Sequence, residues 1–114
     1  SHWQSVIEAM VEVVHGKRGT ARHIGTDLPF QIAGKTGTAQ VFGIAKDAKY
    51  DEELLAKKLH DHALFVAFAP ADDPEIAIAV VVENGGSGSA TAAPIARKLI
   101  DVYFGIETDE PVTE

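Results

Sequence analysis

Two apolar runs joined by a short turn constrain the fold of this chain more than any other feature. Residues 62–69 and 76–82 are rich in Val, Ile, Phe and Ala, and Pro70 and Pro74 bracket the turn between them. Runs of this length and composition favour strands, and so short a connection favours antiparallel pairing in a hairpin. Neither run alternates cleanly with polar residues, which predicts that both faces of the sheet are covered.

Amphipathic helices are predicted towards both ends of the chain. In the first helix, Ser1 and Gln4 have the spacing of a capping box, and Gly16 suits a left-handed C-terminal cap. The second helix has a proline in its first turn and a glycine after its last. Trp3 is expected in the core. The apolar stripes are Trp3, Val6, Ile7, Met10, Val11 and Val14, and then Ile95, Ala96, Leu99, Ile100 and Tyr103.

A third strand is predicted at residues 31–42, where small and β-branched residues surround two glycines that indicate close approach of another group. Residues 17–30 are expected to form a loop with a short extended piece. Residues 43–61 form an excursion too long for a hairpin turn, with a short helix at 51–59, and residues 84–89 form a flexible loop. The order helix, strand, hairpin, helix predicts an antiparallel sheet with packed helices, in the α+β class.

The composition excludes several classes of protein. The chain has 114 residues, no cysteine, no apolar run long enough to cross a membrane, and a formal net charge of -7. Disulfides and thiolate metal sites are therefore excluded, and nucleic acid is not an expected partner. Residues 1–105 are expected to be the folded segment. Residues 106–114 are expected to be a flexible acidic tail, since four acids fall in the last eight residues: Glu107, Asp109, Glu110 and Glu114.

Gly34, Lys35 and Thr36 have the residue types that end a phosphate-binding loop. That motif requires a glycine five residues before Gly34, where this chain has Pro29. It also requires a helix after the loop, whereas an extended apolar stretch follows here. A nucleotide site is therefore rejected.

The tetrapeptide Lys35 to Thr38 also matches the Lys-Thr-Gly motif of active-site serine acyltransferases. On a strand, Thr36 and Thr38 project to one side, and Lys35 and Gly37 to the other. Two hydroxyls can hold a substrate carboxylate while an ammonium lies near the reacting serine, and Gly37 leaves room for the facing wall. The backbone N–H of Thr38 can supply one oxyanion donor. Surface hairpins carry the same four residues by chance, so the motif alone leaves both interpretations open.

Four blocks occur in a characteristic order: residues 18–21, 34–41, 62–70 and 77–86. Together they resemble the C-terminal part of class B penicillin-binding proteins, and within these the elongation transpeptidases of Gram-negative bacteria. The resemblance covers about residues 3–105. It implies the fold shared by penicillin-binding proteins and serine β-lactamases. It also implies a D,D-transpeptidase that cross-links peptidoglycan stem peptides through a serine acyl-enzyme and is a β-lactam target.

The resemblance also implies roles for the tetrapeptide. Lys35 and Thr38 would be catalytic, since Lys35 tunes the neighbouring catalytic serines and the Thr38 N–H completes the oxyanion hole. Thr36, Gly37 and Thr38 would bind substrate, with both threonines at the terminal carboxylate of D-Ala-D-Ala. No metal or cofactor is expected. The expected partners are the stem peptide, β-lactams, the rest of the domain and, through absent regions, a glycosyltransferase of the elongation complex. The expected location is the periplasmic face of the inner membrane.

The chain departs from the family pattern at its serines. None of Ser1, Ser5, Ser87 and Ser89 is followed three residues later by lysine, and no Ser-x-Asn occurs. The nucleophile, its lysine base and the second catalytic serine are therefore absent. We expect the terminal piece of a transpeptidase domain, inactive by itself. The alternatives are a serine β-lactamase and a non-catalytic binding module that retains the fold.

Three other features have less specific interpretations. His60, Asp61 and His62 place two imidazoles near a carboxylate, but without a further ligand nearby they are expected simply to begin a strand. Ser87 and Ser89 have no base in the local sequence and are expected to be linker residues. The excursion at 43–61 directly follows the lysine strand, so it either borders a substrate groove or is an ordinary solvated insertion.

Overall fold

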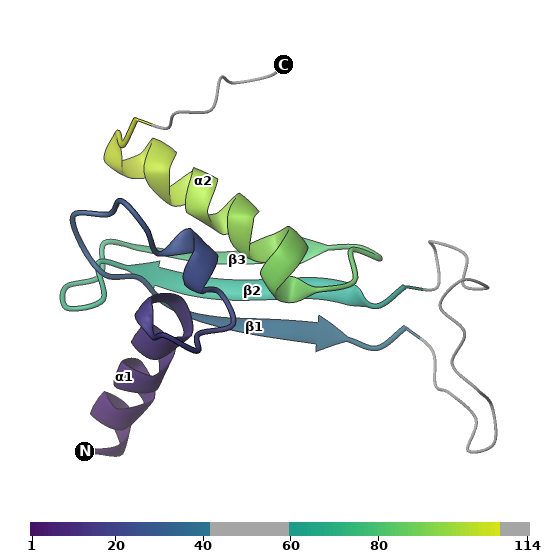
Figure 1. Ribbon diagram of the computed structural model, residues 1–114, viewed down its shortest axis with the longest axis horizontal. Coiled ribbons are helices and arrows are strands. Elements are labelled where there is room, and N and C mark those ends of the chain that lie inside the picture. Colours follow the sequence, from purple (N-terminus) through teal and green to yellow (C-terminus); the bar gives the residue numbers. More distant parts are fainter. Residues whose placement is uncertain (42–59, 108–114) are drawn as a thin grey trace.

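The computed structural model describes residues 1–41 and 60–107 of the chain. Three antiparallel strands form one sheet in the order β1-β2-β3, with two α-helices and two shorter helical turns packed against it (Figure 1). The predicted α+β class is confirmed, and the predicted hairpin has the expected bounds. In chain order the elements are α1 (His2–His15), η1 (Arg22–Ile24), β1 (Ala33–Ala39), β2 (His62–Ala69), β3 (Ile76–Val82), η4 (Gly88–Ala92) and α2 (Ala93–Phe104).

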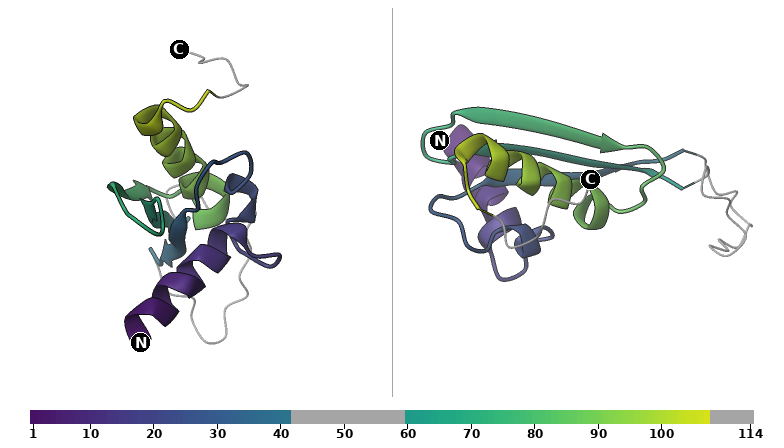
Figure 2. Two further views of the ribbon diagram at one scale, coloured as in Figure 1. Left: turned by 90° about the vertical axis from the view of Figure 1, so that its left-hand side faces the viewer. Right: turned by 90° about the horizontal axis from the view of Figure 1, so that it is seen from above.

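The core lies on one face of the sheet. Alternate residues of the central strand, Ala63, Phe65 and Ala67, are buried there and pair with Val82, Val80 and Ile78 of β3. Seen from above, the sheet runs along one side and α2 lies on the other, together with the C-terminal end of α1 (Figure 2). From these helices and their connections, the core cluster receives Val14, Ala21, Ile24, Ile32, Ala92, Ala93, Ala96 and Ile100.

The opposite face of the sheet is open among the described residues. Val66 is 46% exposed and Val81 is 60% exposed, although both lie within strands. The prediction that both faces are covered is therefore wrong for this part of the chain. The unbroken apolar composition of β2 and β3 produces a second apolar face, and none of the described helices packs on it.

Helix α1 begins as predicted but packs differently. The Gln4 N–H donates to the Ser1 hydroxyl at 3.3 Å, which confirms the cap. Trp3, however, is 76% exposed, so its predicted core position is wrong. Only the C-terminal end of α1 reaches the core, where Val14 is its one buried side chain. Gly16 has φ -76° rather than the predicted left-handed conformation. It is instead a place of close approach, since a Cβ there would lie 2.6 Å from the Glu12 carbonyl.

Helix α2 agrees with the prediction, with a proline at its start and Gly105 in the left-handed region at φ 68°. The Arg97 guanidinium fastens α2 to the end of η1 and the residues after it. It donates to Asp101 at 2.8 Å and to the carbonyls of Ile24 and Thr26, each at 2.6 Å. Asp101 is only 2% exposed, so this pairing satisfies a buried carboxylate.

Two elements differ from the sequence prediction. The predicted extended piece within 17–30 is replaced by the helical turn η1, and β1 is shorter than the predicted strand at 31–42. The predicted helix at 51–59 lies outside the described residues, as do most of the 43–61 excursion and of the 106–114 tail. No helix among the described residues is both long and apolar enough to cross a bilayer.

Candidate active site

The predicted tetrapeptide lies on β1, an edge strand of the sheet. In the antiparallel register, Thr36 and Thr38 pair with Phe65 and Ala63, while Lys35 and Gly37 pair with Val66 and Leu64. Paired residues share a face, so the two threonines project to the helix-covered face and Lys35 to the open face. The predicted alternation is confirmed. The strand runs through these residues to Ala39, so no helix begins directly after Thr36, which also agrees with rejection of the phosphate loop.

The tetrapeptide remains accessible among the described residues. Lys35 and Thr38 are exposed, and Thr36 and Gly37 are half-buried. The Lys35 ammonium folds back along the strand and donates to the Thr36 carbonyl at 2.7 Å. One strand therefore presents two hydroxyls, which suit a carboxylate, on the helix-covered face and an ammonium on the open face.

Thr20 is a neighbour of the tetrapeptide that the sequence analysis did not assign to the site. Its hydroxyl oxygen lies 3.4 Å from that of Thr36. Thr20 belongs to a tight turn held by backbone bonds, in which the Gly19 N–H donates to Gly16 at 3.0 Å and the Ala21 N–H donates to Val13 at 3.0 Å. The only signal of this contact was the block at 18–21, because no local pattern predicts which turn meets a strand sixteen residues away.

Gly37 is also a point of close packing. A Cβ built on Gly88 would lie 2.6 Å from the Gly37 carbonyl and 2.5 Å from that of Leu64. The start of η4 therefore rests directly on the backbone of β1 and β2. Ser87 is an N-cap of η4, since its hydroxyl accepts from the Ala90 N–H at 3.3 Å and contacts the Ser89 hydroxyl at 3.1 Å. The expectation that Ser87 and Ser89 are linker residues is thus wrong, because they organise the turn that supports Gly37.

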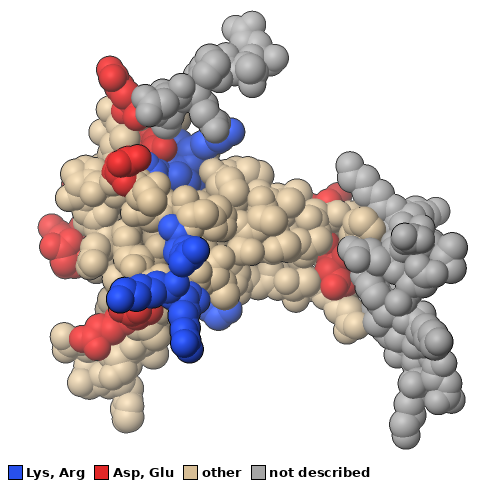
Figure 3. All heavy atoms as spheres, viewed as in Figure 1, with Lys and Arg blue, Asp and Glu red and all other residues tan. Residues whose placement is uncertain are grey.

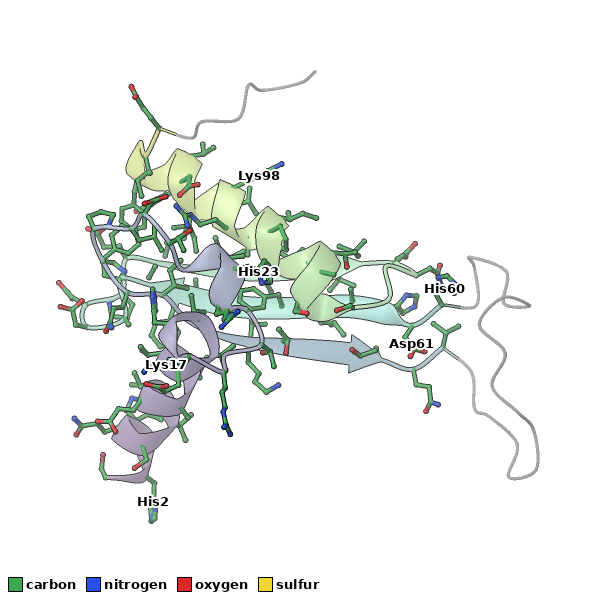
Figure 4. The ribbon with its side chains drawn as sticks, viewed as in Figure 1. His2, Lys17, His23, His60, Asp61 and Lys98 are labelled. Atoms are coloured by element: carbon green, nitrogen blue, oxygen red, sulfur yellow. The ribbon has the colours of Figure 1, made fainter. Side chains whose placement is uncertain are left out.

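His60, Asp61 and His62 lie at the far end of the sheet, and Figure 4 labels the first two there. The Asp61 carboxylate accepts from the Val41 N–H at 3.2 Å, and the His62 Nδ1 accepts from the Asn84 N–H at 2.9 Å. These side chains therefore tie β2 to its neighbouring loops, in agreement with the predicted strand start. No group of three or more metal-ligating side chains occurs within residues 1–41 and 60–107.

His15 fastens the end of α1 to the approach to β1. Its Nε2 accepts from the Ile32 N–H at 2.8 Å, and burial lowers the pKa of this imidazole below its usual value. The neutral form suits the position because only an unprotonated nitrogen can accept this bond. His15 also lines a hollow with Lys17, Arg22 and His23, and this hollow does not include the tetrapeptide.

The described residues thus place Lys35, Thr36 and Thr38 on an accessible edge strand of an α+β sheet. This sequence contains neither Ser-x-x-Lys nor Ser-x-Asn. The sequence matches the family described as "Penicillin binding protein transpeptidase domain" over residues 1–101. The chain belongs to this family.

Within the family, the chain is similar to enzymes of one kind. It is 46% identical over 102 residues to the peptidoglycan D,D-transpeptidase MrdA of Haemophilus influenzae, a match covering 90% of this chain and 16% of that protein. Its fold matches PBP2 of Pseudomonas aeruginosa, solved in complex with WCK 5153, with a TM-score of 0.71 and 48% identity, over 89% of this chain and 19% of that one.

A second solved relative has a protein partner. The match to PBP2 of Helicobacter pylori in complex with MreC has a TM-score of 0.68 and 31% identity, and it covers 89% of this chain and 17% of that one. The chain therefore spans less than a fifth of each relative that it matches here. These likenesses confirm the predicted family and fold.

Proposed function

We propose that this chain is the part of a peptidoglycan D,D-transpeptidase that carries the lysine strand, and that a longer polypeptide supplies the serine nucleophile. The observation that carries this proposal is the placement of Lys35, Thr36 and Thr38 along an accessible edge strand. Family membership supports the same reaction, since the named relative is a D,D-transpeptidase. Lys35 and Thr38 are the proposed catalytic residues, and Thr36, Gly37 and Thr38 the proposed substrate-binding residues.

In the proposed reaction, the carboxylate of a D-Ala-D-Ala peptide lies against the Thr36 and Thr38 hydroxyls. The serine oxygen attacks the carbonyl carbon, and the Thr38 N–H stabilises the resulting oxyanion. The proton of the serine hydroxyl passes to the peptide nitrogen, the peptide bond breaks, and D-alanine leaves as the free amine. The amine of a neighbouring strand then attacks the acyl-enzyme and releases the serine. Lys35 stabilises the negative charge that develops in both steps.

The open apolar face supports the proposal that further polypeptide packs on this chain. Val66 and Val81 expose apolar surface on this face, together with neighbouring alanines at 77 and 79. Contiguous exposed apolar surface of this kind marks an interaction site. We assign it to the rest of the transpeptidase domain.

Partners and location follow from the proposed enzyme. A glycosyltransferase of the elongation complex would bind through other regions, and the MreC complex of the Helicobacter pylori relative supports an assembly of this kind. The proposed location is the periplasmic face of the inner membrane, where the peptidoglycan substrate lies.

Labelling by a fluorescent penicillin tests the proposed function. The complete gene product should form a stable covalent adduct, whereas the 114-residue chain alone should remain unlabelled. Lys35→Ala in the complete protein should slow acylation by about two orders of magnitude or more, because removal of one electrostatic contact to the transition state has this scale. Its folding should stay near normal, since Lys35 is exposed.

Each alternative gives a different result. A serine β-lactamase would release the label by turnover, and a non-catalytic module would never acquire it. Labelling of the isolated chain would contradict the proposal that the nucleophile lies elsewhere. Unchanged acylation of Lys35→Ala would remove Lys35 from the mechanism.

A further inference from the structure

A cluster of cations lies next to β1 in an otherwise acidic protein. Residues 17–35 contain four basic residues, Lys17, Arg18, Arg22 and Lys35, and one acid, Asp27, whereas the whole chain has a net charge of -7. Lys and Arg side chains gather in this region of the surface (Figure 3). Within the described residues, none of the four basic side chains forms an ion pair, since the one pair present joins Arg97 to Asp101. These charges are therefore available to a ligand.

Part of this cluster lines a hollow. Lys17, Arg22 and His23 contribute to its wall with Thr26 and His15, and no acidic residue lines it. Figure 4 labels Lys17 and His23 in this region, on the segment that follows α1. The Glu12 carboxylate lies beside Gly16, which also lines the hollow, but Lys17 and Arg22 outnumber it. This concave surface with several donors therefore favours an anion.

The hollow has a rigid frame. The Arg22 guanidinium donates to the Lys17 carbonyl at 3.0 Å, which fixes the two residues relative to each other. A Cβ on Gly19 would lie 2.2 Å from the Val13 carbonyl, so the turn packs closely against the end of α1. Preorganised donors of this kind lose little conformational freedom when they bind.

The same turn connects the hollow to the candidate active site through the Thr20–Thr36 contact of 3.4 Å. Thr20 is two residues from Arg22 and three from Lys17, and each residue spans at most about 3.6 Å. The backbone of Lys17 therefore lies within about 11 Å of the Thr20 backbone. Since Thr20 contacts Thr36, a short peptide can extend from Thr36 to the hollow.

We infer that this hollow is a second anion-binding subsite, which takes an upstream carboxylate of the peptide whose terminal carboxylate lies against Thr36 and Thr38. The inference rests on the proposed function, because that function supplies the peptide. The proposed function assigns the terminal carboxylate to the two threonine hydroxyls, which leaves the three cations of the adjoining turn, Lys17, Arg18 and Arg22, without an assigned ligand. A membrane surface is a less suitable partner, since the charges line a hollow beside the strand rather than a flat face.

Transpeptidation kinetics of the complete protein test this subsite. Two donor peptides with the same D-Ala-D-Ala end are compared, one with a free upstream carboxylate and one with that carboxylate amidated. The wild type should prefer the free acid by about tenfold in kcat/KM, and the preference should shrink as salt is added. The double variant Lys17→Gln/Arg22→Gln should lose the preference. Lys98→Gln on α2, outside the hollow, is the matched control and should retain it.

Several results would overturn the inference. The first is a wild type that does not prefer the free-acid peptide. The second is a double variant that keeps this preference, and the third is an equal loss of the preference in Lys98→Gln. Loss of binding to vesicles of anionic lipid in the double variant, with the peptide preference intact, would assign the cations to a membrane. Failure of the proposed function is distinct, since the protein would then neither bind penicillin covalently nor use either peptide.

Discussion

Gly88→Ala is predicted to damage both the fold and the site, because Gly88 packs on the backbone of the lysine strand. A Cβ at this position would lie 2.5 Å from the Leu64 carbonyl and 2.6 Å from the Gly37 carbonyl. Ordinary contact begins near 3.4 Å, so η4 or the strands would have to move by about 0.9 Å. Both obstacles are backbone atoms within a sheet, which cannot turn aside as a flexible side chain can.

The magnitude follows from two opposing effects. Overpacking of a well-packed interior costs about 3 kcal/mol at the upper end of its usual range. Alanine in place of glycine within a helix stabilises the folded state by up to about 1 kcal/mol, because the chain loses less backbone entropy on folding. The net expectation is a loss of about 2 kcal/mol in the free energy of unfolding of the chain, measured by urea denaturation.

Gly86→Ala is the matched control. Gly86 has φ 81° and nothing within 4 Å of its added Cβ, so this change costs only backbone strain of about 1 kcal/mol. In the complete protein, Gly88→Ala should also slow penicillin acylation by tenfold or more. A misplacement of active-site groups by about 1 Å slows a reaction by about this factor or more. Gly86→Ala should leave acylation unchanged. A Gly88→Ala chain as stable as the wild type, with normal acylation, would refute the reasoning.

Three further changes test other contacts. Arg97→Met should lower the free energy of unfolding by about 3 kcal/mol in urea denaturation, because Asp101 stays buried without its partner; an equal loss in the variant Arg18→Met, at an exposed position, would contradict this. Stability should fall as the pH drops from 7 to 5.5, because burial lowers the pKa of His15 and the unfolded chain therefore binds the proton first. His15→Gln should flatten this pH dependence, and an unchanged slope would exclude His15. Thr38→Ala in the complete protein should slow penicillin acylation only several-fold, because the backbone donor survives; a loss of several orders of magnitude would assign the main role to the hydroxyl.

The sequence predicts local structure well where local chemistry decides it. The hairpin, the Ser1 cap and the glycine that closes the second helix each depend on residues within a few positions, and each is confirmed. The alternation of Thr36 and Thr38 also follows from the period of a strand. These features need no knowledge of which distant segments meet.

Predictions fail where distant packing decides the result. Trp3 fits the apolar stripe of α1, but the sheet meets only the other end of that helix, so the side chain stays exposed. Gly16 is the residue type typical of a left-handed cap. Glycine is required there, however, because the Glu12 carbonyl leaves no room for a Cβ. Thr20 could not be assigned to the site because its contact with Thr36 arises from the turn that the backbone of α1 holds in place.

The two exposed features of the sheet have different physical meanings. An apolar surface such as Val66 and Val81 is costly in water and becomes stable when covered, so it marks a permanent contact within a folded unit. The cations beside β1 are stable when hydrated and gain from an anion only when it arrives, so they suit a ligand that comes and goes. The proposed structural contact therefore lies on the open face, which Lys35 shares, whereas the proposed ligand contacts of the threonines and the adjoining turn lie away from it. On this basis, burying the apolar face should raise stability, whereas neutralising the cations should change recognition with little effect on folding.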